Sequence, residues 1–120
     1  AIHLDSGSRI ETDAPVDNQG KGELFSPTDL FAAALASCMI TIMGISARDQ
    51  GFALKGAWAE VEKIMAASPR RVAEIIIDIY FPDGSTYGDR EKRIIEAAAK
   101  ACPVSNSLHP EVKKTLRFHY

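Results

Sequence analysis

The chain has 120 residues, of which 46% are apolar and 25% are charged, a composition typical of one soluble globular domain. Its formal net charge of −2 gives no basic surface of the kind that binds nucleic acid. Two cysteines are too few for a secreted disulfide scaffold, so we expect a cytoplasmic protein.

The N-terminal segment predicts short extended runs over residues 2–5 and 8–12, joined by a turn at DSGS. The chain begins with Ala1 inside the first run, without the basic and apolar regions of a signal peptide. We therefore expect a single domain over residues 1–120 whose N-terminal strand is truncated. Residues 14–25 are rich in Gly, Pro and Asn and predict a loop.

A long helix is predicted from Ser26 to about Gln50. Ser26 is a preferred N-cap residue, proline follows it in the first turn, and Asp29 stands three residues later, as in a capping box. Gly51 suits the left-handed position that ends a helix.

This predicted helix is apolar or small on every face, which is typical of a helix surrounded by protein. Residues 30–47 carry no charge and reach the lower limit of a transmembrane length. However, they are rich in Ala, Ser, Thr and Gly and lack flanking basic clusters and aromatic belts, so we predict a buried helix and no membrane span. So small a domain can barely cover such a helix, which indicates a second subunit.

The remaining chain predicts a β-hairpin from two β-branched or alternating runs, a loop, an amphipathic helix that ends before Pro103, and a last strand. Their predicted ranges are 54–66 and 71–81 for the hairpin, 82–89 for the loop, 90–101 for the helix and 113–120 for the strand. The expected fold class is α+β, with the long buried helix packed against antiparallel strands.

The only two cysteines, Cys38 and Cys102, are the first candidates for chemistry. Each is equally consistent with a small buried apolar side chain. Cys102 precedes a proline that can begin a new helical turn, and at such an N-cap the helix amides would stabilise a thiolate. A cytosolic pair can cycle between dithiol and disulfide, but no C-x-x-C motif is present and sequence spacing leaves the pairing open.

Other polar residues give weaker signals. Asp29 lies nine residues before Cys38, on the opposite side of the helix and about 13 Å away along its axis. It therefore either caps the helix or serves the cysteine of a partner subunit. The three histidines have no metal-binding spacing, and no phosphate-binding loop is present, so we expect neither metal nor cofactor.

The segments FSPTDLFAAALASCMITIMG and ACPVSNSLHP resemble the OsmC/Ohr family of osmotically inducible and organic hydroperoxide resistance proteins. The similarity extends through DNQGKGE, PRRV and the final strand, and it is greatest to the OsmC-like branch. The resemblance implies an OsmC-like fold in which two chains form an intertwined homodimer, with the long helices at its centre and active sites at the interface. It also implies a thiol peroxidase.

By this resemblance, Cys38 attacks an organic hydroperoxide and becomes a sulfenic acid, Cys102 resolves it to a disulfide, and an external dithiol reduces the disulfide. The family lowers the pKa of the attacking thiol with an arginine held by a glutamate. Arg9 is the arginine available in the N-terminal segment. The alternatives are an arginine in the upstream segment that we expect to be missing, and Arg48, which lies near the end of the predicted helix. Thr28 occupies the glutamate position, and the acid is Asp29, one residue later.

Two other functions are consistent with the same residues. The apolar surface near Phe31, Met39 and Met43 could hold a small hydrophobic ligand without turnover. Alternatively, the protein could be a redox sensor or structural dimer whose disulfide alters partner binding. Peroxide consumption and multiple turnover distinguish these functions from a peroxidase.

Overall fold

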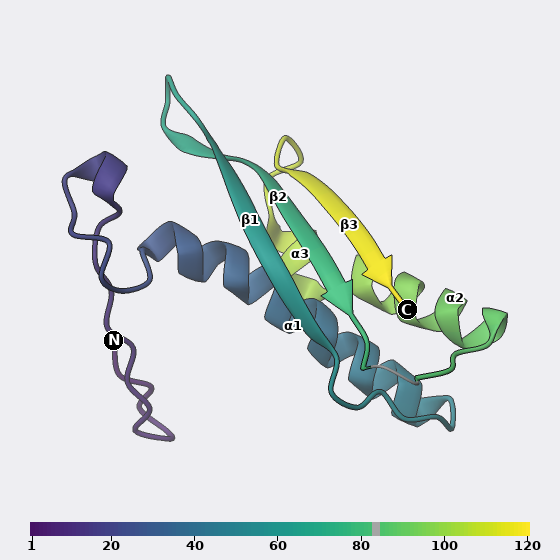
Figure 1. Ribbon diagram of the computed structural model, residues 1–120. Coiled ribbons are helices and arrows are strands. Elements are labelled where there is room, and N and C mark those ends of the chain that lie inside the picture. Colours follow the sequence, from purple (N-terminus) through teal and green to yellow (C-terminus); the bar gives the residue numbers. More distant parts are fainter. Residues whose placement is uncertain (83–84) are drawn as a thin grey trace. The chain divides into compact units, whose positions relative to one another are not determined.

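The structure is a computed structural model that describes residues 1–82 and 85–120. It confirms the α+β class, with helices and one sheet (Figure 1). The chain forms two compact units, Ala1–Phe31 and Ala32–Tyr120, which are described separately. Residues 83–84 of the loop predicted over 82–89 lie outside the described residues.

In the first unit, the two predicted extended runs are reduced to one isolated antiparallel bridge between Ile2 and Arg9. Gly7, with φ of +72°, lies in the turn between them. Leu4 is 92% exposed, so this ribbon buries little apolar surface. A two-stranded ribbon without a packed face is marginal in water, which explains why the runs do not form strands. The predicted loop over 14–25 contains a short 3-10 turn, Val16–Asn18.

Helix α1, Pro27–Asp49, confirms the predicted long helix. The capping box is present: the Asp29 N–H donates to Ser26 Oγ at 3.1 Å, and the Ser26 N–H donates to Asp29 Oδ2 at 2.8 Å. Gly51 ends the helix with φ of +83°, a conformation that costs glycine little.

The sheet has the order β1-β2-β3, with strands Trp58–Ala66, Arg71–Tyr80 and Lys113–His119. Strands β1 and β2 pair antiparallel and confirm the predicted hairpin. Strand β3 pairs parallel to β2, so the prediction of a purely antiparallel sheet was wrong. The reason is the connection: α2, Asp89–Lys100, and α3, Pro103–Ser107, form a crossover that returns the chain to the start of β2.

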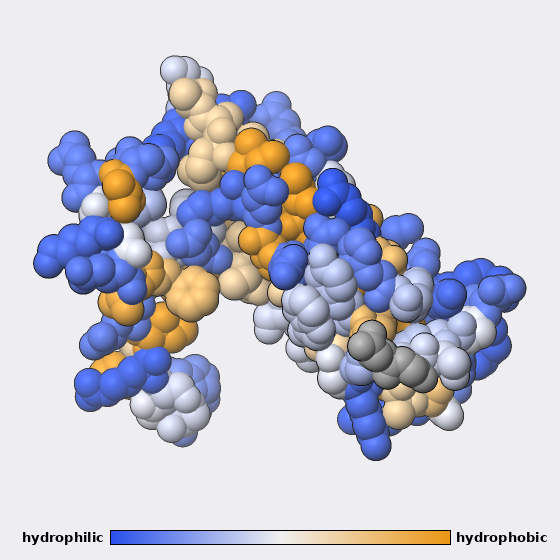
Figure 2. Space-filling model, viewed as in Figure 1, coloured by the Kyte–Doolittle hydropathy of each residue, from blue (hydrophilic) through white to orange (hydrophobic). Residues whose placement is uncertain are grey.

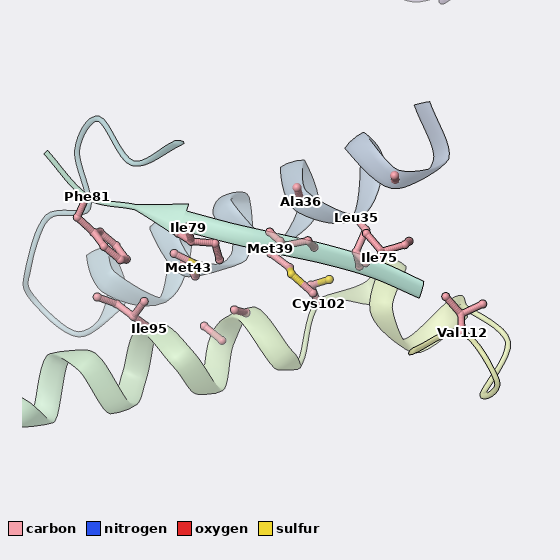
Figure 3. Close-up of a cluster of buried hydrophobic side chains, with 14 residues drawn as sticks. Leu35, Ala36, Met39, Met43, Ile75, Ile79, Phe81, Ile95, Cys102 and Val112 are labelled. Atoms are coloured by element: carbon pink, nitrogen blue, oxygen red, sulfur yellow. The ribbon is translucent and has the colours of Figure 1, made fainter. Parts of the chain in front are cut away.

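The three helices cover one face of the sheet, and the core lies between the two layers (Figures 1 and 3). Strand β2 contributes a row of three isoleucines with no exposed surface, which face small and apolar residues of α1 and α2. The fully buried members of this core with the largest side chains are Leu35, Met39, Met43, Ile75, Ile77, Ile79, Ile95 and Cys102.

Within one chain, α1 is buried on one side only. Met39 and Met43 are buried, whereas Ile45 is 40% exposed and Thr41 is also exposed. By length and composition alone α1 could cross a membrane. Its buried side is part of the core, so we assign α1 as a core helix. The open side is the surface for which the sequence predicted a second subunit.

The outer face of the sheet carries hydrophilic side chains around a smaller apolar area (Figure 2). At one end, the rings of Trp58, Tyr80 and His119 are stacked, with centroids 4.3 and 4.5 Å apart. Next to them, Asp78 binds His119 Nε2 at 2.7 Å and Arg117 at 3.3 Å. The hydrogen bond with His119 and the charge of Arg117 lower the pKa of Asp78.

Candidate active site

Cys38 lies near the middle of α1, where the helix packs against the core. Its side chain is half-buried, so it keeps access to the surface of the chain. The neighbouring Met39 has only 1% of its surface exposed and points into the core (Figure 3). The helix therefore presents Cys38 at the edge of the packed layer.

Cys102 occupies the short connection between α2 and α3. Pro103 begins α3, and Cys102 is its N-cap, with an extended backbone at φ −66° and ψ 143°. The Ser105 N–H donates to Cys102 Sγ at 3.3 Å. This confirms the predicted N-cap position, because proline both disfavours helical geometry at Cys102 and suits the first helical turn. The side chain has no exposed surface.

The two cysteines lie close together in the fold although they are far apart in the sequence. Both cysteines are free, and Cys38 packs against the buried cluster that contains Cys102, close enough to raise the pKa of the Cys102 thiol. Figure 3 shows the Cys102 side chain inside the apolar cluster, beside Met39. Their proximity arises because α1 and the α2–α3 connection pack against the same face of the sheet.

The protonation of Cys102 differs from the prediction. The amides of Ser105 and Val104 do favour the thiolate, as expected for an N-cap. However, burial disfavours the charged form more strongly, and the hydrogen bond and charge of Cys38 add to this effect. The result is a raised pKa for the Cys102 thiol. The sequence had indicated the cap but not the complete burial of the sulfur.

A cavity of about 410 Å³ has sequence neighbours of both cysteines in its lining. Its lining includes Met39, which is adjacent to Cys38 in α1, and Ser105, whose N–H donates to Cys102 Sγ. The other lining residues are Lys100, Lys114 and Leu116. The sequence analysis missed the two lysines. The alternation of β3 was a usable signal, because it places Lys114 on the same side as Leu116, toward the helices.

Arg9 and Asp29 belong to the first unit, whereas both cysteines belong to the second. Arg9 forms the bridge with Ile2, and Asp29 caps α1 through Ser26. The assignment of either residue to the thiol site therefore rests on the sequence. Within residues 1–82 and 85–120, no group of three His, Cys, Asp or Glu side chains could hold a metal ion.

These observations define a class of protein: a two-layer α+β domain with two cysteines close together in its core. The profile of the OsmC-like protein family matches residues 20–117. The chain belongs to this family.

Solved structures share the fold. A Psychrobacter arcticus 273-4 protein, provisionally described as an osmotic stress induced and detoxification response protein, is 52% identical. It superposes with a TM-score of 0.92 over 98% of this chain and 85% of that one. The organic hydroperoxide resistance protein OsmC of Legionella pneumophila is 22% identical, with a TM-score of 0.78 over 97% of this chain and 85% of that one.

A relative of longer sequence is also similar. An uncharacterised protein of Methanocaldococcus jannaschii is 30% identical over 105 residues, which cover 81% of this chain and 53% of that protein. The matched region thus spans about half of the relative's length.

Proposed function

We propose that the protein is a cytoplasmic thiol peroxidase that reduces organic hydroperoxides. The observation that carries the proposal is the proximity of Cys38, which is half-buried, to Cys102, which is fully buried in the cluster against which Cys38 packs. Membership of a family that includes a protein named for organic hydroperoxide resistance supports the choice of substrate.

In the first step, the Cys38 thiolate attacks one oxygen of the peroxide bond. The O–O bond breaks, the Cys38 sulfur keeps one oxygen as a sulfenic acid, and the other oxygen leaves as an alcohol after it takes a proton. Cys38 suits this role because its side chain is the more accessible of the two. We propose that Arg9 stabilises the attacking thiolate and that Asp29 orients the arginine, as the family resemblance implies.

In the second step, Cys102 attacks the Cys38 sulfur and displaces hydroxide, which takes the Cys102 proton and leaves as water. The product is a Cys38–Cys102 disulfide. An external dithiol then reduces it by two successive thiol–disulfide exchanges and becomes a disulfide itself. The raised pKa of Cys102 favours this order, because the buried thiol keeps its proton until the sulfenic acid forms next to it.

We also propose that two chains associate as a homodimer through the open side of α1. The exposed residues Ala34, Thr41 and Ile45 are small or apolar and follow one another at helical spacing. Light scattering at micromolar concentration measures the mass directly. A monomeric mass would contradict this part of the proposal.

The test of the function is intact-mass analysis without reductant, after one equivalent of tert-butyl hydroperoxide. Wild type should lose two hydrogens, and peptide mapping should find Cys38 linked to Cys102. Cys102→Ser should stop at a sulfenic acid that dimedone traps, and Cys38→Ser should not react. Two thiols that stay free in wild type after prolonged exposure would refute the proposal. In that case, the ligand-binding function would take its place.

The redox-sensor alternative predicts the same disulfide but no repeated turnover. Hydroperoxide consumption with an excess of dithiothreitol or dihydrolipoamide separates the two functions. A peroxidase consumes many equivalents of peroxide per chain, whereas a sensor is oxidised once and consumes no more while its partner is absent.

A further inference from the structure

The cavity beside the thiols has a lining of mixed chemistry. Its volume of about 410 Å³ lies in the range of small-molecule sites. Two of its residues come from β3, whose alternation turns them toward the helices: Lys114 pairs with Ile75 and Leu116 pairs with Ile77, both fully buried. Lys100, in the last turn of α2, also lines the cavity.

Two ammonium groups therefore border one cavity. Lys114 Nζ donates to the carbonyl oxygen of Ser105 at 3.3 Å, which holds it at the cavity wall. The residues that are described as lining the cavity include no Asp or Glu to balance the two charges. The adjacent lysine of β3 shows the contrast, because Lys113 faces the other side of the sheet and is paired with Glu74 at 3.0 Å.

The rest of the lining is apolar or neutral. Met39 is almost completely buried, and Leu116 packs against the core. The Cys102 thiol behind Ser105 stays neutral, because burial raises its pKa, and so it supplies no counter-charge. The lining thus combines two lysines with a methionine and a leucine.

We propose that this cavity binds an organic carboxylate with an apolar chain. The two lysines hold the carboxylate with charge-assisted hydrogen bonds, and the chain lies on Met39 and Leu116. A phosphate ion could use the two lysines but would leave Met39 and Leu116 without an apolar partner, so it fits the described lining less well. This site does not depend on peroxidase activity, since binding involves no change at either sulfur.

The probe is decanoate, with 1-decanol as its uncharged counterpart, and the protein is reduced wild type. Methionine methyl groups labelled with carbon-13 report the location of binding by NMR. The chain has three methionines, so Met43 and Met65 are internal controls for Met39. Decanoate should shift the Met39 methyl resonance in a saturable manner and leave Met65, on strand β1, in place.

Calorimetric titration then tests the charges. Lys100→Gln and Lys114→Gln should each weaken decanoate binding about threefold to tenfold, the range expected for a partly exposed ionic hydrogen bond. The double variant should lose more than either. The matched control is Lys55→Gln, an exposed lysine outside the cavity lining, which should bind decanoate like wild type.

Three outcomes would overturn the proposal. The first is equal affinity for decanoate and decanol, and the second is an equal loss of affinity in Lys55→Gln. The third is the absence of a Met39 shift in wild type at millimolar decanoate. Since the NMR experiment uses the wild-type chain, a variant that fails to fold does not remove the test. Failure of peroxide turnover leaves these results unaffected, so the two proposals fail separately.

Discussion

Replacing Cys102 separates its structural role from its chemistry. Serine and alanine both remove the resolving thiol, but only serine keeps an acceptor for the Ser105 N–H at the N-cap of α3. Both variants should therefore fail to form the disulfide, whereas their stabilities should differ. Any difference in free energy of unfolding between the two variants reports the cap and not the redox reaction.

The magnitude follows from the burial of the donor. Ser105 is 6% exposed, so its N–H has little access to water when the acceptor is removed. Loss of an N-cap acceptor costs about 0.5–2 kcal/mol, and a buried donor left unpaired costs about 1–3 kcal/mol. These two ranges describe the same lost bond and are not added. We expect Cys102→Ala to be about 1–2 kcal/mol less stable than Cys102→Ser, or roughly 4–8 °C lower in melting temperature.

The assay is urea unfolding of both variants in dithiothreitol, followed by circular dichroism, at one protein concentration so that any association is matched. Mass analysis after peroxide should confirm that neither variant forms an intramolecular crosslink. Equal midpoints and equal slopes for the two variants would show that the Ser105–Cys102 hydrogen bond contributes nothing measurable. The account of Cys102 as a structural N-cap would then be wrong.

Three further predictions follow from single positions. Arg9→Ala should lower the rate of Cys38 oxidation by tert-butyl hydroperoxide at least tenfold in stopped-flow measurements, and an unchanged rate removes Arg9 from the site. Ser26→Ala should destabilise the fold by about 1 kcal/mol in urea through the lost cap of α1, without slowing Cys38 oxidation. Folding lowers the pKa of the Asp78 carboxyl below its ordinary value of 3.8, so the ionised carboxylate stabilises the folded state at pH values above 3.8. This stabilisation is lost as the pH falls through the lowered pKa. Asp78→Asn should therefore reduce the acid-induced loss of stability between pH 5 and pH 2 in urea titrations, and an identical pH profile would contradict the assignment.

Local signals predicted the helices and the hairpin well. The helix α1 is specified at both ends by residues whose backbone preferences act within a few positions: Ser26 and Asp29 at its start and Gly51 at its end. The β-branched run of β2 likewise predicted a strand, because three isoleucines alternate toward the core. Such signals depend on nearest neighbours and do not require knowledge of the rest of the fold.

The direction of β3 could not be predicted in this way. Its residues alternate equally well in a parallel and in an antiparallel pair, and the choice depends on where α2 and α3 return the chain. The pairing of Cys38 with Cys102 has the same origin, since it depends on the packing of two separate segments on one sheet face. Only the family resemblance connected the two cysteines in advance. Lys114 was missed because the sequence does not show that it pairs with Ile75, whose burial places Lys114 on the side of the sheet that faces the helices.

The burial of Cys102 gives the two thiols different roles. Two sulfurs in contact cannot both ionise readily, because the second negative charge is repelled by the first. Burial favours the protonated form of Cys102, which has no exposed surface and whose pKa is raised in spite of the Ser105 amide. In the proposed mechanism, the more accessible Cys38 meets the peroxide, and the proton that Cys102 retains converts the departing hydroxide into water. Complete burial, which would make Cys102 a poor first nucleophile, therefore suits it to the second step, where the electrophilic sulfur forms beside it.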